Sequence, residues 1–360
     1  MNESSESDLS TSSIEQLAVA MKKLNVEKIG ISGGEPFMRS DLFHLLNVME
    51  ENEIAISSIL TNGIKLNEAV IEKIKSFRNR CTVFVSLDGL DFGSMKFRGF
   101  KDEKSCRRVF NKIVRNIRKA LQSNISIMIN TAVTNQNVND LCAMYDWFRQ
   151  MGVSGWRVAL PKLAGAFRNN QSSFFVDRET VFASYLKLIE RHFETRGPEL
   201  NFRLQIEHFF RMEVFNDLEL LSPKDAVCDY EGKKESCCIK PNGDITPCPL
   251  YLDLTIGNLK SVRLEDAWYS KKMQDIKEIC IHDVVKCRGC RLSSICATGC
   301  RANAIFIHGS IYELDDDACV AAKFFLEKVV PVLRKNNIHN PILEKMAAEF
   351  HRNTAYKSSD

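Results

Sequence analysis

The sequence lacks several motifs by which common enzyme classes are recognised. Its seven histidines are scattered, and it contains neither a His-Glu-x-x-His zinc motif nor a Gly-x4-Gly-Lys-Ser/Thr phosphate loop. It has no run of about eighteen apolar residues that could cross a bilayer. Its N-terminus is rich in serine and acidic residues, unlike a secretory signal. We therefore expect a cytoplasmic protein with no membrane partner.

The sequence also lacks a strong excess of charge of either sign. Its 49 basic and 46 acidic residues give a formal net charge of +3, which does not by itself indicate a nucleic-acid partner. Basic residues crowd residues 104–119, which we interpret as the solvated face of a helix. A length of 360 residues with 44% hydrophobic residues is sufficient for two globular domains.

Cysteine, in contrast, is abundant, and its spacing indicates metal chemistry. Thirteen cysteines in a reducing compartment favour metal ligation over disulfides. Residues 287–300 read Cys-Arg-Gly-Cys-Arg-Leu-Ser-Ser-Ile-Cys-Ala-Thr-Gly-Cys, and a further cysteine, Cys319, follows. A Cys-x-x-Cys turn lets two thiolates face one metal centre, whereas inert core thiols rarely recur at this spacing. Cys81, Cys106 and Cys142 stand alone in apolar segments and are expected in the core.

Alternating strand-like and helix-like segments predict the fold. Apolar segments rich in β-branched residues alternate with amphipathic segments up to about residue 196, as in βα units around a parallel sheet. The expected strands are residues 26–32, 55–60, 81–87, 125–133 and 155–160. The expected helices are residues 13–24, 40–52, 67–78, 106–122, 137–151 and 178–196. Because a helix comes first, we expect the first strand of a barrel to be missing.

These segments predict an α/β fold with two domains and a tail. Residues 1–200 are expected to form a partial (β/α)6 TIM-like barrel. Residues 201–335 are expected to form a small cysteine-rich domain, closed by a helix at 316–334. Residues 336–360 are expected to be a polar tail with one short helix.

Residues at the ends of three expected strands are candidates for ligand binding, because side chains after the strands of a parallel barrel form its functional face. They are Gly33, Gly34, Glu35, Pro36, Ser86, Asp88 and Asn130. The glycines let a ligand approach the backbone, and Glu35 supplies an acceptor for an ammonium group. Ser86 and Asp88 suit a ribose. Each residue taken singly is also explained as a turn or a helix cap.

Residues 236–248 predict a β-hairpin with Asn-Gly at the centre of a type I′ turn. A two-residue loop places Cys237 directly opposite Cys248 and turns Cys238 to the other face. We therefore expect Cys237 to be a metal ligand and Cys238 to be a core residue.

Taken together, these features resemble the radical S-adenosylmethionine (radical SAM) enzymes that carry a C-terminal SPASM domain. This group includes anaerobic sulfatase-maturing enzymes and peptide maturases. The resemblance covers most of residues 10–330 and depends on Ser-Gly-Gly-Glu-Pro at 32–36, Ser-Leu-Asp-Gly at 86–89 and the cysteine series. The SPASM signature is similar to the series Cys228, Gly243, Cys248, Cys287, Cys290, Cys296, Cys300 and Cys319.

The resemblance implies S-adenosylmethionine and two auxiliary [4Fe–4S] clusters as cofactors. One cluster would be held by Cys287, Cys290, Cys296 and Cys319. The second would be held by Cys228, Cys248 and Cys300, with Cys237 as the fourth ligand on the basis of the hairpin register. Residues 33–36 would bind the methionine amino group, and Ser86 and Asp88 would lie near the ribose.

The family binds its catalytic cluster through a Cys-x3-Cys-x2-Cys run, which this sequence does not contain. We therefore expect an N-terminally incomplete chain that is inactive as it stands. The activity implied by the resemblance is modification of a peptide or protein side chain through hydrogen abstraction by a 5′-deoxyadenosyl radical. The implied electron donor is of flavodoxin or ferredoxin type.

Two interpretations from other functional classes remain open on the sequence alone. The first is a non-catalytic iron–sulfur protein that transfers electrons or binds a peptide. The second is a zinc-binding interaction module, because structural zinc sites also use Cys-x-x-Cys spacing. The sequence does not identify a substrate.

Overall fold

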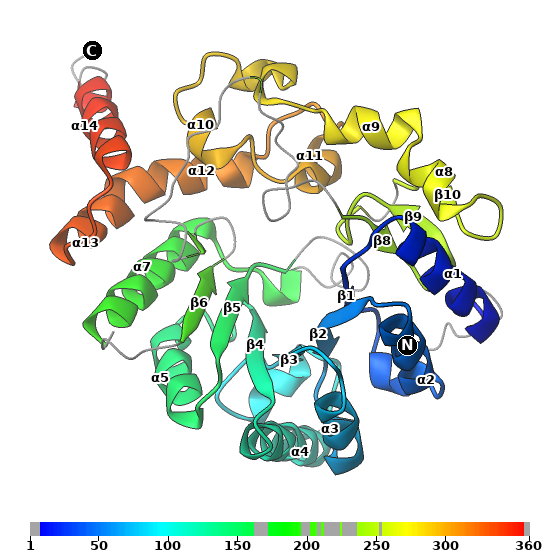
Figure 1. The fold of residues 1–360 in the computed structure, drawn as a ribbon. Coiled ribbons are helices and arrows are strands. Elements are labelled where there is room, and N and C mark those ends of the chain that lie inside the picture. The colour runs from blue at the N-terminus through cyan, green and yellow to red at the C-terminus, as the bar shows by residue number, and fades with distance from the viewer. Residues whose placement is uncertain are drawn as a thin grey trace. The chain divides into compact units, whose positions relative to one another are not determined.

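A computed structural model (Figure 1) describes most of the chain, and the Cys228 position lies outside the described residues. The described residues are 8–161, 172–195, 202–206, 210–211, 224, 236–251 and 254–355. Within these ranges, no helix is both long enough and apolar enough to span a membrane.

In the described residues, seven strands form the main sheet, and they are hydrogen-bonded in chain order. They are β1 (Lys28–Ile31), β2 (Ala55–Thr61), β3 (Thr82–Ser86), β4 (Ser126–Ala132), β5 (Gly155–Ala159), β6 (Arg203–Ile206) and β7 (Phe210–Arg211). β1 to β6 run parallel, and β7 pairs antiparallel with β6. This sheet confirms the predicted α/β class of a partial TIM-like barrel, with β1 at one end of the strand order.

The helices of the βα units agree with the amphipathic segments of the sequence. They are α1 (Thr11–Lys23), α2 (Leu42–Glu51), α3 (Glu68–Lys75), α4 (Glu103–Gln122), α5 (Leu141–Met151) and α7 (Arg178–Glu194). α4 begins three residues before its expected start because the Asp102 carboxylate accepts a hydrogen bond from the Ser105 amide at 2.8 Å and caps the helix. Its buried residues, among them Ile113 and Ile117, recur at helical spacing on one face.

Short elements dominate the C-terminal part of the chain. The strands β8 (Cys238–Ile239), β9 (Asp244–Thr246) and β10 (Gly257–Asn258) form a small antiparallel sheet in the order β10-β9-β8. The helices are α8 (Leu264–Trp268), α9 (Lys271–Lys277), α10 (Ser293–Cys296), α11 (Arg301–His308), α12 (Asp316–Phe324), α13 (Val330–Lys335) and α14 (Pro341–Ala355). A π turn (Phe325–Val329) joins α12 to α13 just before Pro331, which has no N–H to donate to the preceding turn.

The chain divides into two compact units, each with a core of its own. The first contains the described parts of residues 1–131, 148–155 and 230–277, and the second contains those of 132–147, 156–229 and 278–360. In the first unit, Leu17 of α1 packs with Ile245 of β9 and Leu264 of α8. In the second, Ile281, Val284 and Cys287 belong to one buried cluster. The first unit therefore joins the expected first helix to the small sheet.

The predicted register of the hairpin is wrong by one residue. β8 pairs Cys238 with Thr246 and Ile239 with Ile245, so that Cys237 does not lie opposite Cys248. The loop contains three residues, because the Gly243 amide donates to the Lys240 carbonyl at 2.9 Å and only Gly243 has a positive φ, of 93°. Pro241 favours the second position of a type I turn, and Gly243 completes the three-residue loop.

Candidate functional site

The glycine turn after β1 presents open backbone. Gly33 has a φ of 137°, which favours glycine. A Cβ atom added at Gly33 or Gly34 would meet no described atom within 4 Å. The predicted role of this turn as a place where a ligand approaches the main chain is compatible with that space.

Glu35 is fixed at the end of this turn by donors from β2 and the residue that follows it. Its carboxylate accepts hydrogen bonds from the Thr61 hydroxyl and the Asn62 amide, each at 2.7 Å, and from the Phe37 amide at 3.3 Å. Pro36 begins the short 3-10 helix Pro36–Met38, whose N-cap is Glu35. Because a carboxylate has about four lone-pair sites, this one can still accept a bond from an ammonium group. Thr61 and Asn62 were not recognised in the sequence, because their link to Glu35 spans two βα units.

The ends of β3 and β4 bring three of the predicted residues close together. Ser86 pairs with Asn130 in the parallel register. The Asp88 carboxylate is 2% exposed and forms an ion pair with Arg98 at 2.6 Å. Asn130 Oδ1 is buried and has no hydrogen-bond donor within the described part of the chain. A buried carbonyl oxygen without a donor is unfavourable, so Asn130 suits a polar ligand that donates to it.

The four predicted ligands of the first cluster all lie in the second unit. Cys287 ends the 3-10 helix Val285–Cys287, Cys296 ends α10, Cys319 lies in α12, and Cys290 lies between them on an exposed turn. Burial raises the pKa of the Cys296 thiol to about 12, and the charges of the other three sulfurs add to the rise. Burial and the charges of Cys319 and Cys290 likewise raise the pKa of Cys287. The fold therefore makes these four thiols neighbours.

The described His, Cys, Asp and Glu side chains include no group of three arranged to hold a single metal ion. In an all-thiolate zinc site, sulfurs about 2.3 Å from the ion lie about 3.8 Å from one another. A four-iron cluster holds its thiolates farther apart, because irons and sulfides lie between them. A single zinc ion and a four-iron cluster therefore require different separations of the same four thiolates.

The remaining predicted ligands do not form a described site. Cys228 is outside the described residues, Cys248 is half-buried in the first unit, and Cys300 is half-buried in the second. Cys237 packs against the apolar cluster around Leu17 and Ile245. Cys237 was predicted to be a ligand because of the expected hairpin register, and that register is wrong. The ligand role of Cys237 itself stays a prediction.

Two further residues beside the four thiols were not recognised in the sequence. Arg301 directly follows Cys300 and is 1% exposed, and Asp315 is fully buried. The only sequence signal for Arg301 is a charged residue within the apolar helix that follows the cysteine run. Asp315 is the N-cap of α12, so in the sequence it resembles an ordinary helix cap.

Comparisons with known proteins match two parts of the chain to family models. Residues 2–148 match the model of the radical SAM superfamily, and residues 228–291 match that of the iron–sulfur cluster-binding domain called SPASM. These descriptions agree with the cofactors predicted from the sequence. The Fe-coproporphyrin III synthase of Methanosarcina barkeri is 24% identical over 344 residues, which cover 88% of this chain and 82% of that protein.

Peptide-modifying proteins are also among the relatives. The PqqA peptide cyclase of Gluconobacter oxydans is 21% identical over 308 residues, which cover 85% of this chain and 79% of that protein. A solved structure described as native anSMEcpe with bound AdoMet and Cp18Cys peptide has a TM-score of 0.67 at 17% identity, covering 91% of each chain. At this identity, the structural likeness shows the fold alone. By its two family matches, the chain belongs to the radical SAM superfamily and carries a SPASM iron–sulfur cluster-binding domain.

Proposed function

We propose that the reaction served by this chain is the modification of a peptide or protein side chain by hydrogen-atom abstraction. The supporting observation is that this member of the family has both a polar edge, at the ends of β1, β3 and β4, and a group of four neighbouring thiols. Relatives such as the PqqA peptide cyclase support the substrate class. We further propose residues 1–200 as the partial barrel, 201–335 as the SPASM domain and 336–360 as the tail.

The polar edge would hold S-adenosylmethionine. Glu35, already fixed by Thr61 and Asn62, would accept a bond from the amino group of the methionine moiety. Ser86 and the donor-free Asn130 Oδ1 would contact the nucleoside. Asp88 would lie next to the ribose while its carboxylate stays paired with Arg98. Beside a reduced cluster, the bound cofactor supplies the group that abstracts hydrogen.

The SPASM cysteines would hold two auxiliary [4Fe–4S] clusters. Cys287, Cys290, Cys296 and Cys319 would hold the first, and Cys228, Cys248 and Cys300 would contribute to the second. For the fourth ligand, the observed register favours Cys238 over Cys237. Cys238 pairs with Thr246, the last residue of β9, and Cys248 lies two residues beyond the end of that strand. A flavodoxin or ferredoxin type protein is the proposed electron donor.

We propose that the 360-residue chain does not by itself bind the radical-forming cluster, since the Cys-x3-Cys-x2-Cys run is absent from it. The test is anaerobic incubation with S-adenosylmethionine and dithionite, followed by chromatography for 5′-deoxyadenosine. We expect no product above a control without protein. Multiple turnovers would contradict this part of the proposal and would mean that other cysteines hold the reactive cluster.

An iron porphyrin is a second candidate for the substrate, because relatives include the Fe-coproporphyrin III synthase named above. The two substrate classes can be separated by absorbance titration with Fe-coproporphyrin III. We expect no shift of the porphyrin band at equal concentrations of protein and porphyrin. A saturable shift with one porphyrin per chain would favour the porphyrin reaction over peptide modification.

A further inference from the structure

Arg301 is a buried cation that forms no ion pair within the described part of the chain. Its guanidinium donates to the main-chain carbonyls of Thr298 and Glu313, and to that of Ile311 at 2.9 Å. Its Nε atom is buried and has no acceptor, and it forms no ion pair with any carboxylate in the described ranges. Burying an unpaired charge is costly unless an anion compensates it. The side chain therefore indicates an anionic group that binds beside it.

The position of Arg301 identifies that anion. Its bond to the Thr298 carbonyl places the guanidinium at the turn of residues 296–300, two residues after the candidate ligand Cys296. The cation therefore lies beside a segment that carries one of the four candidate cluster ligands. A [4Fe–4S] cluster with four thiolates carries net negative charge, and reduction adds one more unit.

The backbone held by Arg301 is itself unusual. Three successive residues between Cys296 and Cys300 have positive φ, namely Ala297 at 48°, Thr298 at 62° and Gly299 at 77°. The first two are not glycine, and this conformation costs such residues about 1–2 kcal/mol each. The bonds from Arg301 and from the Asp315 amide, the latter at 3.3 Å, both end on the Thr298 carbonyl. These two hydrogen bonds hold the strained turn between Cys296 and Cys300.

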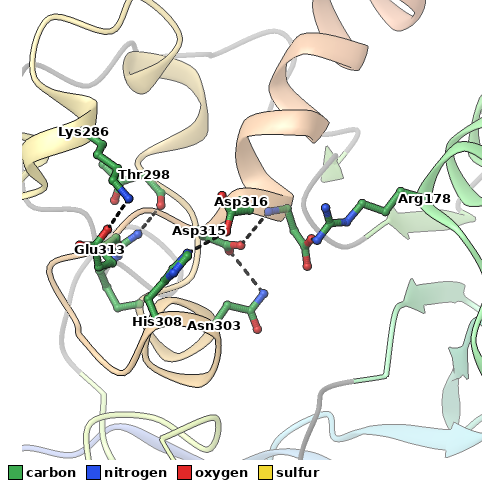
Figure 2. A network of polar contacts seen from close by, with 10 residues as sticks. Arg178, Lys286, Thr298, Asn303, His308, Glu313, Asp315 and Asp316 are labelled. Carbon is green, nitrogen blue, oxygen red and sulfur yellow. Dashed lines mark hydrogen bonds and ion pairs between the residues drawn. The ribbon is translucent and has the colours of Figure 1, made fainter. Parts of the chain in front are cut away.

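Asp315 holds the other end of the turn, and Figure 2 shows its contact with Asn303. Its carboxylate accepts from the Cys300 amide at 2.9 Å, from the Asp317 amide at 3.1 Å and from Asn303 Nδ2 at 3.4 Å. The Asp315 main-chain carbonyl also accepts from the Cys319 amide at 3.2 Å. Two buried side chains of opposite charge therefore lie beside segments that carry Cys296 and Cys319.

We propose that Arg301 positions the turn at residues 296–300 and raises the reduction potential of the cluster held by Cys287, Cys290, Cys296 and Cys319, while Asp315 lowers it. This inference rests on the proposed function, namely that these cysteines hold a [4Fe–4S] cluster. Reduction transfers one electron from dithionite to the cluster and needs no proton. The reduced form carries the larger negative charge, so a fixed cation favours it and a fixed anion disfavours it.

The test is a potentiometric titration of the full chain with dithionite, followed by electron paramagnetic resonance. We expect Arg301→Met to shift the midpoint potential of one cluster downward, whereas Arg301→Lys, which keeps the charge, stays near the unmodified value. Equal potentials for Arg301→Met and the unmodified chain, or equal shifts for Met and Lys, would overturn the inference.

Asp315→Asn keeps the inference falsifiable if Arg301→Met fails to retain the cluster. The amide keeps an oxygen acceptor for the Cys300 amide but removes the charge, so we expect an upward shift of the same cluster. No shift, or a downward one, would overturn the electrostatic role. An unmodified chain that holds no iron at all would instead reject the proposed function, which separates the two failures.

Discussion

At the scale of single residues, the candidate sites are marked by buried polar groups that lack partners. Asn130 Oδ1 has no donor and Arg301 Nε has no acceptor in the described parts of the chain. Each lies beside residues that the sequence had already singled out. Their environments depend on contacts between distant segments, so the sequence predicted Asn130 from its strand position alone and missed Arg301.

We predict that Asn130→Leu separates stability from cofactor binding. Removing the donor-free oxygen should raise the free energy of unfolding of the cofactor-free chain by about 1–3 kcal/mol. Loss of one hydrogen bond should weaken S-adenosylmethionine binding about tenfold. Thermal denaturation and isothermal titration calorimetry measure the two effects. Asn130→Asp, which keeps an acceptor, is the control, and unchanged affinity in the leucine variant would argue against contact with the cofactor.

The two adjacent hairpin cysteines should behave differently. We predict that Cys238→Ala removes about four irons from the reconstituted chain, because Cys238 shares a face with Thr246. Cys237→Ala should keep the irons and lower the free energy of unfolding by about 1 kcal/mol, since Cys237 packs against the apolar cluster. Iron analysis and thermal denaturation check both variants. The opposite iron contents would restore Cys237 as the ligand.

At the scale of elements, turn chemistry decides where the sequence predictions hold. The positions of strands and helices could be predicted from hydrophobic periodicity, because apolar residues that share a face pack together in the fold. The Asn-Gly pair suggested a two-residue hairpin loop, but Pro241 shifts the turn by one residue and so reverses the faces of Cys237 and Cys238. β6 escaped prediction because its alternation of polar and apolar residues extends over only four positions.

Two glycines of the cysteine run provide a matched test of the turn that Arg301 holds. Gly299 and Gly289 have similar φ, of 77° and 73°. A Cβ atom at Gly299 would lie 2.5 Å from the Cβ atoms of Asp315 and Ala318, whereas at Gly289 it would meet nothing within 4 Å.

We predict that Gly289→Ala costs only the conformational penalty, about 1–2 kcal/mol. Gly299→Ala should cost about 2–5 kcal/mol, because the clash with Asp315 adds to that penalty, and it should impair iron incorporation. Chemical denaturation and iron analysis compare the variants. Equal losses of stability in both would show that Asp315 does not constrain the turn.

At the scale of the whole molecule, the sequence predicted the family and the α/β fold because both depend on local motifs and periodicity. The family resemblance implied one cluster at Cys287, Cys290, Cys296 and Cys319, and these four thiols are neighbours in the second unit. The sequence did not predict that α1 packs on the small sheet around Ile245, because that contact joins segments more than two hundred residues apart. The tail prediction missed the length of α14, which buries Leu343 and Ala347.

The central claim is that this chain holds two auxiliary four-iron clusters through its SPASM cysteines. Its most direct test is the iron, sulfide and zinc content of the full chain after anaerobic reconstitution, read together with the absorbance near about 400 nm. We predict a brown protein with about eight irons and eight sulfides per chain, where a third cluster would give about twelve irons. A colourless protein that contains zinc and no iron would contradict the account and support a zinc-binding module instead.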